Sequence, residues 1–186
     1  METSVLGHWL LYHKATQSKI AEAPSRVGRS LLLLNQIREG MFSCGFVTSD
    51  FAFAELYQVL RDNIVANKIL KAAHSLVYFP ELKSQFALSK EEIKDMRTYL
   101  DEFYSVLDEL KIRAYIMKMD MRRARKFITD LNLSTPDAIH LAWAISKPPY
   151  DYFVTDDSDF LAIRGRVQKP RIVKPSGVHT CKELHA

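Results

Sequence analysis

Acidic side chains stand at four places in this sequence where a helix or strand is expected to begin or end. They are Glu2, Glu55, Asp137 and the cluster of Asp156, Asp157 and Asp159. Two carboxylates about 4 Å apart repel by roughly 4 kcal/mol at an effective dielectric near 20, so a converging group calls for a cation. Mg²⁺ takes oxygen ligands and is commonly completed by phosphates. The chemistry open to such a group is metal-assisted attack of water on a phosphodiester.

The element that positions Asp137 is a strongly apolar helix. Thr135 is expected to be its N-cap and Pro136 its first residue, which puts Asp137 in the first turn, near the positive end of the helix dipole. Between Ala138 and Ile145 only His140 is polar, which is typical of a core helix. Taken alone, Asp137 would only complement the helix dipole. We interpret His140 as a hydrogen-bonded core histidine and leave it out of the site.

The acidic cluster follows a predicted strand. The β-prone run from Tyr152 to Val154 leads directly into Asp156, Asp157 and Asp159. In open α/β sheets ligands bind at the carboxyl ends of strands, so this loop is a candidate site. The alternative is that the three carboxylates are turn or cap residues before a short helix around Phe160.

Glu2 and Glu55 belong to two further strand and helix starts. Residues 1–6 are expected to form only a very short strand or a turn. Residues 46–48 are a predicted strand that leads into a helix over 50–60, where Glu55 lies beside the buried face. Glu55 could equally be a solvated helix residue.

The remaining elements surround these four places. We predict helices over 24–38, with Val27, Leu31 and Leu34 facing inward, over 64–77, and from Ser89 onward, where Ser89 and Glu92 form a capping box. The last two should form an antiparallel pair. A buried strand is expected over 113–117 and a final strand over 170–174. Asp120 should cap a helix that carries a basic cluster of Arg122, Arg123, Arg125 and Lys126.

Composition sets broad limits. The formal net charge of +4 is compatible with an anionic partner. Cys44 and Cys181 lie far apart, which suggests neither a metal knuckle nor a disulfide framework. No apolar run is long enough to span a bilayer and no leader is evident, so we expect a cytoplasmic protein with no membrane association.

Taken in order, these motifs resemble the PIN-domain family, and within it the VapC-like toxin ribonucleases of prokaryotic toxin–antitoxin pairs. The residues that carry the resemblance lie at 2–6, 48–55, 136–142 and 154–160. The resemblance implies an α/β PIN-like three-layer fold, a short parallel sheet flanked by helices. Here residues 61–111 would add a helical-hairpin elaboration to one domain over 1–186. It also implies a metal-dependent ribonuclease that uses Mg²⁺ or Mn²⁺, with RNA as substrate. An antitoxin protein and a second copy in a homodimer are the expected partners.

The resemblance also assigns roles to the acidic residues. Glu55, Asp137 and Asp157 match the family's metal-binding positions, and Asp159 matches a further acidic position with a catalytic or orienting role. Glu2 stands where the family has aspartate. We include Glu2 as a metal ligand, although its longer side chain suits octahedral Mg²⁺ less well.

Two alternatives remain open at this point. The basic cluster at 122–126 is a candidate RNA-binding track, although such a cluster is more often a solvated helix face. The chain could also be a catalytically weak or inactive PIN-like module that binds RNA or a protein partner. The glutamate at position 2 favours this second reading, and the intact set of Glu55, Asp137 and Asp157 favours the enzyme.

Overall fold

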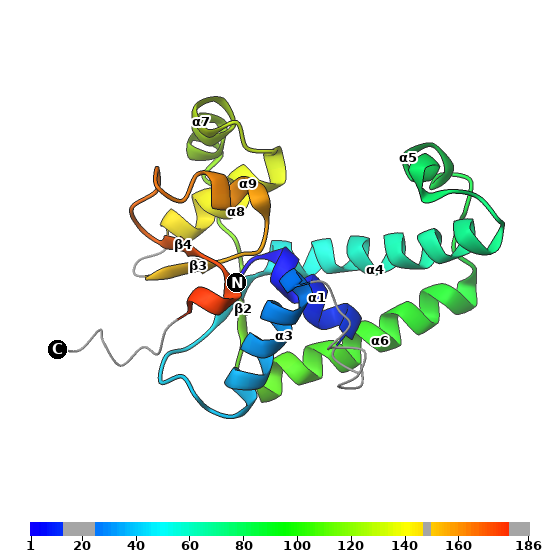
Figure 1. The fold of residues 1–186 in the computed structure, drawn as a ribbon, viewed down its shortest axis with the longest axis horizontal. Helices are drawn as coiled ribbons and strands as arrows, with labels where there is room; N and C mark the ends of the chain where they lie inside the picture. The colour runs from blue at the N-terminus through cyan, green and yellow to red at the C-terminus, as the bar shows by residue number, and fades with distance from the viewer. Residues whose placement is uncertain (13–24, 147–149, 179–186) are drawn as a thin grey trace.

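The structure is a computed structural model, and it describes residues 1–12, 25–146 and 150–178. It is a mixed α/β fold in which helices predominate and the strands are short and parallel (Figure 1). The helices are α1 (Thr3–Tyr12), α3 (Ser25–Arg38), α4 (Asp50–Lys71), α5 (Phe79–Leu82), α6 (Lys90–Glu109), α7 (Met121–Leu131), α8 (Thr135–Ser146) and α9 (Ser158–Ala162). The strands are β1 (Val47–Ser49), β2 (Arg113–Tyr115), β3 (Tyr152–Val154) and β4 (Arg171–Val173). Two 3₁₀ turns, η1 (Leu76–Tyr78) and η2 (Pro175–Gly177), complete the elements.

The strands form two parallel pairs, β1 with β2 and β3 with β4. Met1 and Glu2 connect the two pairs, because the Met1 amine donates to the carbonyl of Val47 and the Glu2 N–H donates to the carbonyl of Val154 at 3.1 Å. The strands predicted at 46–48, 152–154 and 170–174 are confirmed to within a residue or two at each end. Met1 therefore lies beside the start of β1, and Glu2 lies beside the carboxyl end of β3.

The N-terminal segment differs from its prediction. A very short strand or turn was expected over 1–6, but α1 already begins at Thr3. Glu2 starts this helix, because its side chain accepts a hydrogen bond from the Ser4 N–H at 3.0 Å and its carbonyl accepts from Leu6. Val5, Leu6, Trp9 and Leu10 on α1 are fully buried, so helix formation is driven by packing.

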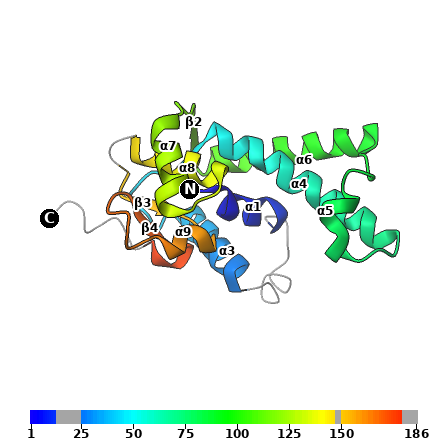
Figure 2. The ribbon, with the colours of Figure 1, turned by 90° about the horizontal axis from the view of Figure 1, so that it is seen from above.

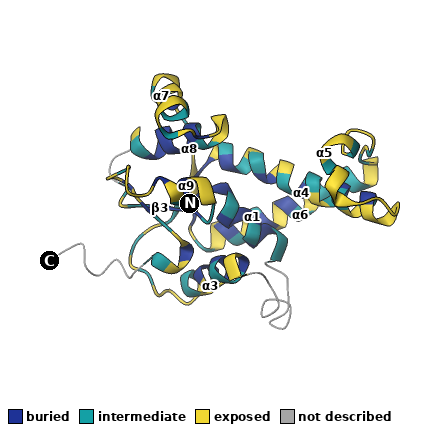
Figure 3. Ribbon diagram, turned by 45° about the horizontal axis from the view of Figure 1, so that its top comes forward, coloured by how far each residue is buried: buried dark blue, intermediate teal, exposed yellow. Residues whose placement is uncertain are grey.

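Two hydrophobic clusters make up the core (Figure 3). The first joins α1, α3, α4 and α6 around Trp9, and Val27, Leu31 and Leu34 form the inward face of α3, as predicted. The second joins α7, α8, α9, β3 and β4 around Trp143. Both tryptophans are core residues.

Helices α4 and α6 run side by side as the predicted pair and extend away from the strands (Figures 1 and 2). The capping box of Ser89 and Glu92 is confirmed at the start of α6. The boundary predicted between a helix over 50–60 and another over 64–77 is wrong, because α4 is continuous to Lys71. Neither glycine nor proline occurs within α4, so nothing in the chain interrupts it.

Three further expectations need comment. The strand predicted as buried over 113–117 forms as β2 over 113–115, but the burial prediction is wrong, because its residues are exposed. Cys44 is disulfide-bonded, although the wide separation of the two cysteines in the sequence suggested no disulfide framework. Cys181 lies outside the described residues, as does Pro24, the expected start of the helix over 24–38. In the described part of the chain, no helix combines the length and the apolar character needed to cross a membrane.

Candidate functional site

Glu2 lies between the two strand pairs and is almost completely buried, with 5% of its surface exposed. Its carboxylate accepts hydrogen bonds from the N–H and hydroxyl of Ser4 and from the Thr155 hydroxyl at 2.9 Å. Burial raises the pKa of Glu2, while these hydrogen bonds and the nearby His140 oppose the shift. The Glu2 carboxylate is therefore committed to protein donors rather than turned to solvent.

Glu55, in the second turn of α4, is held by two residues from other helices. Its Oε2 accepts a hydrogen bond from the Thr3 hydroxyl and lies 2.6 Å from Nε2 of His140. The His140 ring is 3% exposed, contacts Thr3 at 3.3 Å and packs 5.1 Å from the ring of Phe51. The prediction that His140 is a hydrogen-bonded core histidine is confirmed, but its partner is one of the candidate site residues.

Asp137 lies in the first turn of α8, as predicted, although the cap is one residue earlier than expected. Ser134, not Thr135, accepts from the Asp137 N–H at 3.3 Å, and its hydroxyl donates back to the Asp137 carboxylate. Burial raises the pKa of Asp137, and the negative charges of Asp157 and Asp159 add to this increase, whereas Ser134 and His140 oppose it. The start of α8 and the acidic loop are thus close enough to affect each other electrostatically.

The three carboxylates of the acidic loop, those of Asp156, Asp157 and Asp159, interact with different partners. Asp157 caps α9 by accepting from the Asp159 N–H at 2.7 Å, and its own N–H donates to the Thr155 hydroxyl at 3.0 Å. The Asp156 side chain is 1% exposed and pairs with Arg29 at 2.8 Å. Asp156 is therefore already neutralised, while Asp157 and Asp159 remain beside Asp137. Asp157 is therefore a helix cap, as the alternative in the sequence analysis proposed, and its charge also acts on Asp137.

Sequence reasoning missed the polar residues that connect the carboxylates. Thr155 bridges Glu2 and Asp157, Ser4 bridges Glu2 and the Asp156 N–H at 3.2 Å, and Thr3 holds Glu55. Each of these hydroxyl residues lies within two positions of an acidic residue in the chain. That adjacency was a usable signal. Nothing local to Arg29 in the sequence indicates its pairing with Asp156.

The basic cluster lies on α7, which packs along α8 (Figure 2). Arg123 donates to the Ser146 hydroxyl at 2.9 Å, so the start of α7 meets the end of α8. Nine residues separate Ser146 from Asp137, a distance of about 13 Å along a helix. Arg122, Arg125 and Lys126 are exposed. The four basic residues thus lie beyond the carboxylates, at the other end of α8.

The site contains the kind of side chains that bind a divalent cation, but in this structure they are not arranged closely enough to bind one. Carboxylate oxygens are the donors that Mg²⁺ and Mn²⁺ prefer. Burial raises the pKa of Asp137, and a cation would offset the smaller, additional effect of the Asp157 and Asp159 charges. Within the described ranges, however, no three His, Cys, Asp or Glu side chains are gathered closely enough to hold a metal ion. Among the candidate ligands Glu2 is buried, whereas Glu55, Asp137 and Asp157 are partly exposed and Asp159 is exposed.

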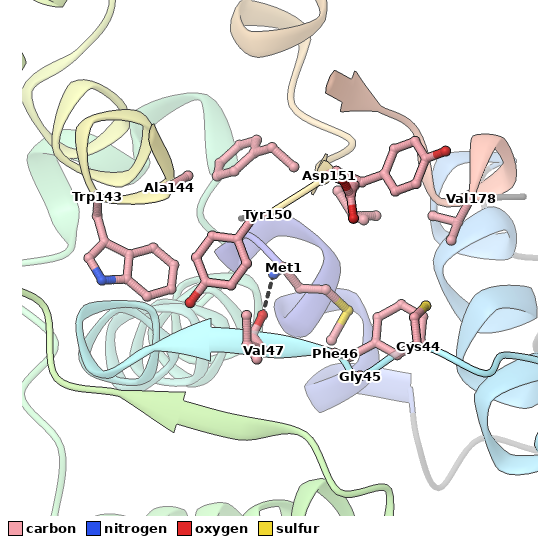
Figure 4. A pocket seen from close by; sticks show the side chains of 13 residues that line it. Met1, Cys44, Gly45, Phe46, Val47, Trp143, Ala144, Tyr150, Asp151 and Val178 are labelled. Atoms are coloured by element: carbon pink, nitrogen blue, oxygen red, sulfur yellow. Dashed lines mark hydrogen bonds between the residues drawn. The ribbon is translucent and has the colours of Figure 1, made fainter. Parts of the chain in front are cut away.

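A separate pocket of about 120 Å³ opens where β1 and β3 begin, away from the acidic residues (Figure 4). Its walls include Met1, Val47, Trp143 and Tyr150, which are mainly apolar or aromatic. The Trp143 indole N–H has no hydrogen-bond partner among the described residues. This pocket shares no carboxylate with the acidic site.

Comparison with protein-family models, curated proteins and solved structures finds no match to this chain. The function is therefore argued from the acidic site itself.

Proposed function

We propose that the protein is a PIN-like endoribonuclease that hydrolyses RNA phosphodiesters with the help of Mg²⁺ or Mn²⁺. The observation that carries the proposal is that Asp137, whose pKa is raised chiefly by burial, lies close enough to Asp157 and Asp159 for their negative charges to raise it further. These residues come from the start of one helix and from the loop after a parallel strand, where α/β proteins place their ligand sites. Glu55 reaches the same region from α4 and shares His140 with Asp137 electrostatically.

In this proposal Asp137, Asp157 and Glu55 hold the metal, which when bound lowers the pKa of a water and stabilises charge on the phosphate. Thr3 and His140 fix the Glu55 side chain, so that its carboxylate is oriented before substrate arrives. The Thr155 hydroxyl sets the start of the loop that carries Asp157, and Asp159 orients Asp157 through its N–H. Glu2 has its oxygens occupied by Ser4 and Thr155, so its part as a ligand stays a prediction.

The identity of the RNA and of the partners also belongs to the proposal. A cytoplasmic toxin with an antitoxin protein as its inhibitor, acting as a homodimer, is the biological setting that the resemblance implies. The basic residues of α7 are proposed to contact RNA phosphates beyond the carboxylates.

A second candidate function is a catalytically weak or inactive PIN-like module that binds RNA or a protein. Two observations favour it: the Glu2 carboxylate is buried against protein donors, and no metal-sized cluster is preformed in the described residues. The two candidates differ in whether a cation binds and whether RNA is cut.

The deciding experiment compares the native protein with Asp137→Asn on a labelled single-stranded RNA, with Mg²⁺, Mn²⁺ or EDTA. The enzyme proposal expects metal-dependent cleavage by the native protein and none by the variant, with both folded by circular dichroism. It also expects millimolar Mn²⁺ to raise the melting temperature of the native protein, by mass action on the folded state. Absence of both cleavage and a metal-dependent melt would favour the binding module.

A further inference from the structure

A groove of about 660 Å³ lies between α7, the end of α8 and the segment that precedes β4. Lys126, Phe127, Asp130 and Leu131 form its α7 side, Ile145 comes from α8, and Arg166 to Lys169 form the opposite side. Its volume is in the range of small-molecule sites. The acidic residues of the candidate site do not line it.

The rim of the groove carries more positive than negative charge. Lys126, Arg166 and Lys169 are exposed around it, and Asp130 is its only carboxylate among the described lining residues. The Asp130 carboxylate accepts a hydrogen bond from the Thr129 hydroxyl at 2.9 Å, while its backbone carbonyl accepts from the Arg166 guanidinium. In the described chain neither Lys126 nor Lys169 makes an ion pair. The groove is thus a place where an anion gains attraction without displacing a carboxylate.

The floor of the groove is apolar. Phe127, Leu131, Ile145 and Val167 are each half-buried, so they present surface to the groove while packing against the second hydrophobic cluster. Phe127 supplies an aromatic face, and an unpaired nucleic-acid base stacks on such a face whatever its sequence. A cationic rim above an aromatic floor matches a nucleotide, which has a charged phosphate and a flat base.

We propose that this groove binds one nucleotide of single-stranded RNA outside the cleavage site, with its phosphate at Lys126, Arg166 and Lys169 and its base against Phe127. The inference rests on the proposed function and deepens it by naming a substrate subsite. Lys126 is the one member of the predicted RNA-binding cluster that lines the groove. Ile145 lies eight residues from Asp137 on the same helix, about 12 Å away along its axis, so one strand of RNA reaches both places.

RNA fits the groove better than an acidic protein segment does. An acidic peptide would satisfy the cations but would leave the aromatic floor without a planar partner. An acidic peptide is therefore the rival that the experiment must separate.

The test measures binding rather than cleavage, so it does not depend on the catalytic proposal. Affinity for a short fluorescein-labelled single-stranded RNA is measured by anisotropy in EDTA, across a salt series. The groove variant is Lys126→Gln, Arg166→Gln and Lys169→Gln. The control is Lys90→Gln, Lys94→Gln and Arg97→Gln, which removes the same charge from exposed positions of α6.

We expect the groove variant to lose on the order of tenfold in affinity and the magnitude of its salt slope to fall by about 0.7, since the contacts to one phosphate are removed. The control should stay close to the native protein. Phe127→Leu, which keeps an apolar floor, should also lose on the order of tenfold, because stacking contributes that much per base. Thermal melts identify any variant that has lost its fold, and in that case Lys126→Gln and Lys169→Gln are measured singly.

Equal losses in the groove variant and the control would overturn the subsite, because only net charge would then matter. If the groove variant binds RNA as tightly as the native protein but no longer binds a polyglutamate peptide, the ligand of the groove is an acidic protein segment and not RNA. If the native protein fails to cut RNA but the groove variant still loses binding selectively, the catalytic proposal fails and the subsite stands.

Discussion

Thr155 offers the sharpest test of how the site is built, because one hydroxyl serves two acidic residues. The side chain is completely buried, donates to the Glu2 carboxylate at 2.9 Å and accepts from the Asp157 N–H at 3.0 Å. Thr155→Val keeps the shape and removes both hydrogen bonds. A hydrogen bond to a charged group contributes about 1.5–3 kcal/mol, and an unpaired N–H adds about 1 kcal/mol or more. The expected loss of unfolding free energy is therefore about 2–4 kcal/mol.

For a chain of this size such a loss lowers the melting temperature by roughly 5–15 °C. The matched control is Thr155→Ser, which keeps the hydroxyl and loses one methyl group, at a cost of about 1 kcal/mol. Differential scanning calorimetry of the three proteins at neutral pH measures the difference. Melting of the Val variant within about 2 °C of the Ser variant would refute the reading of Thr155 as the bridge.

The pH dependence gives this prediction a second, independent readout. Burial already raises the pKa of Glu2, and the Thr155 hydrogen bond opposes that increase. Thr155→Val therefore raises the pKa of Glu2 further. A carboxyl whose folded-state pKa is raised contributes stability below its unfolded pKa, and that contribution is lost as pH rises through the folded value. The gap between the Thr and Val proteins should accordingly narrow as pH falls and Glu2 becomes protonated.

Three further predictions use other parts of the site. Asp137→Asn should raise the melting temperature of the metal-free protein at neutral pH and lose this advantage in acid, because burial raises the pKa of Asp137 in the folded state. Parallel melts at several pH values measure it, and the same gain at every pH would contradict the raised pKa. Arg29→Ala should lower the free energy of unfolding by about 3 kcal/mol, because it leaves the buried Asp156 unpaired, and adding Asp156→Asn should restore part of that loss. Urea unfolding measures the single and the double variant, and equal stabilities would contradict the pairing. Glu2→Asp should increase single-turnover RNA cleavage over the native protein at matched metal, whereas Glu2→Ala should not; equal rates in all three proteins would exclude Glu2 from catalysis.

Much of the framework could be predicted because its signals are local. The strand before Asp156, the capping box at Ser89 and the inward face of α3 each depend on residues close together in the chain, and each was found. The acidic residues after β1 and β3 could also be placed, since the carboxyl ends of parallel strands meet on one side. These inferences need no knowledge of tertiary contacts.

The errors arose where tertiary contacts decide. The helix α1 begins directly after Glu2 because that residue's side chain and carbonyl accept the first N–H groups of the helix, a role that glutamate rarely signals. Strand β2 has a β-prone sequence, but no helix among the described residues covers it enough to bury its side chains, and a β-prone run alone does not indicate that. His140 was correctly placed in the core, but a sequence pattern cannot say that its partner comes from α4, eighty-five positions earlier in the chain.

The spacing of acidic residues in the sequence predicts where the site lies better than it predicts which of those residues bind a metal. Four acidic positions arrive at one end of the strands, yet each carboxylate has its own protein partners: Glu2 has Ser4 and Thr155, Glu55 has Thr3 and His140. A hydroxyl or imidazole that holds a carboxylate in place also competes with a cation for its oxygens. Metal binding in the proposed enzyme therefore depends on the carboxylates with the fewest internal donors. Among the described residues the Asp159 carboxylate accepts no hydrogen bond, and those of Asp137 and Asp157 accept one each, from the Ser134 hydroxyl and the Asp159 N–H. These three carboxylates meet that condition better than Glu2 and Glu55 do.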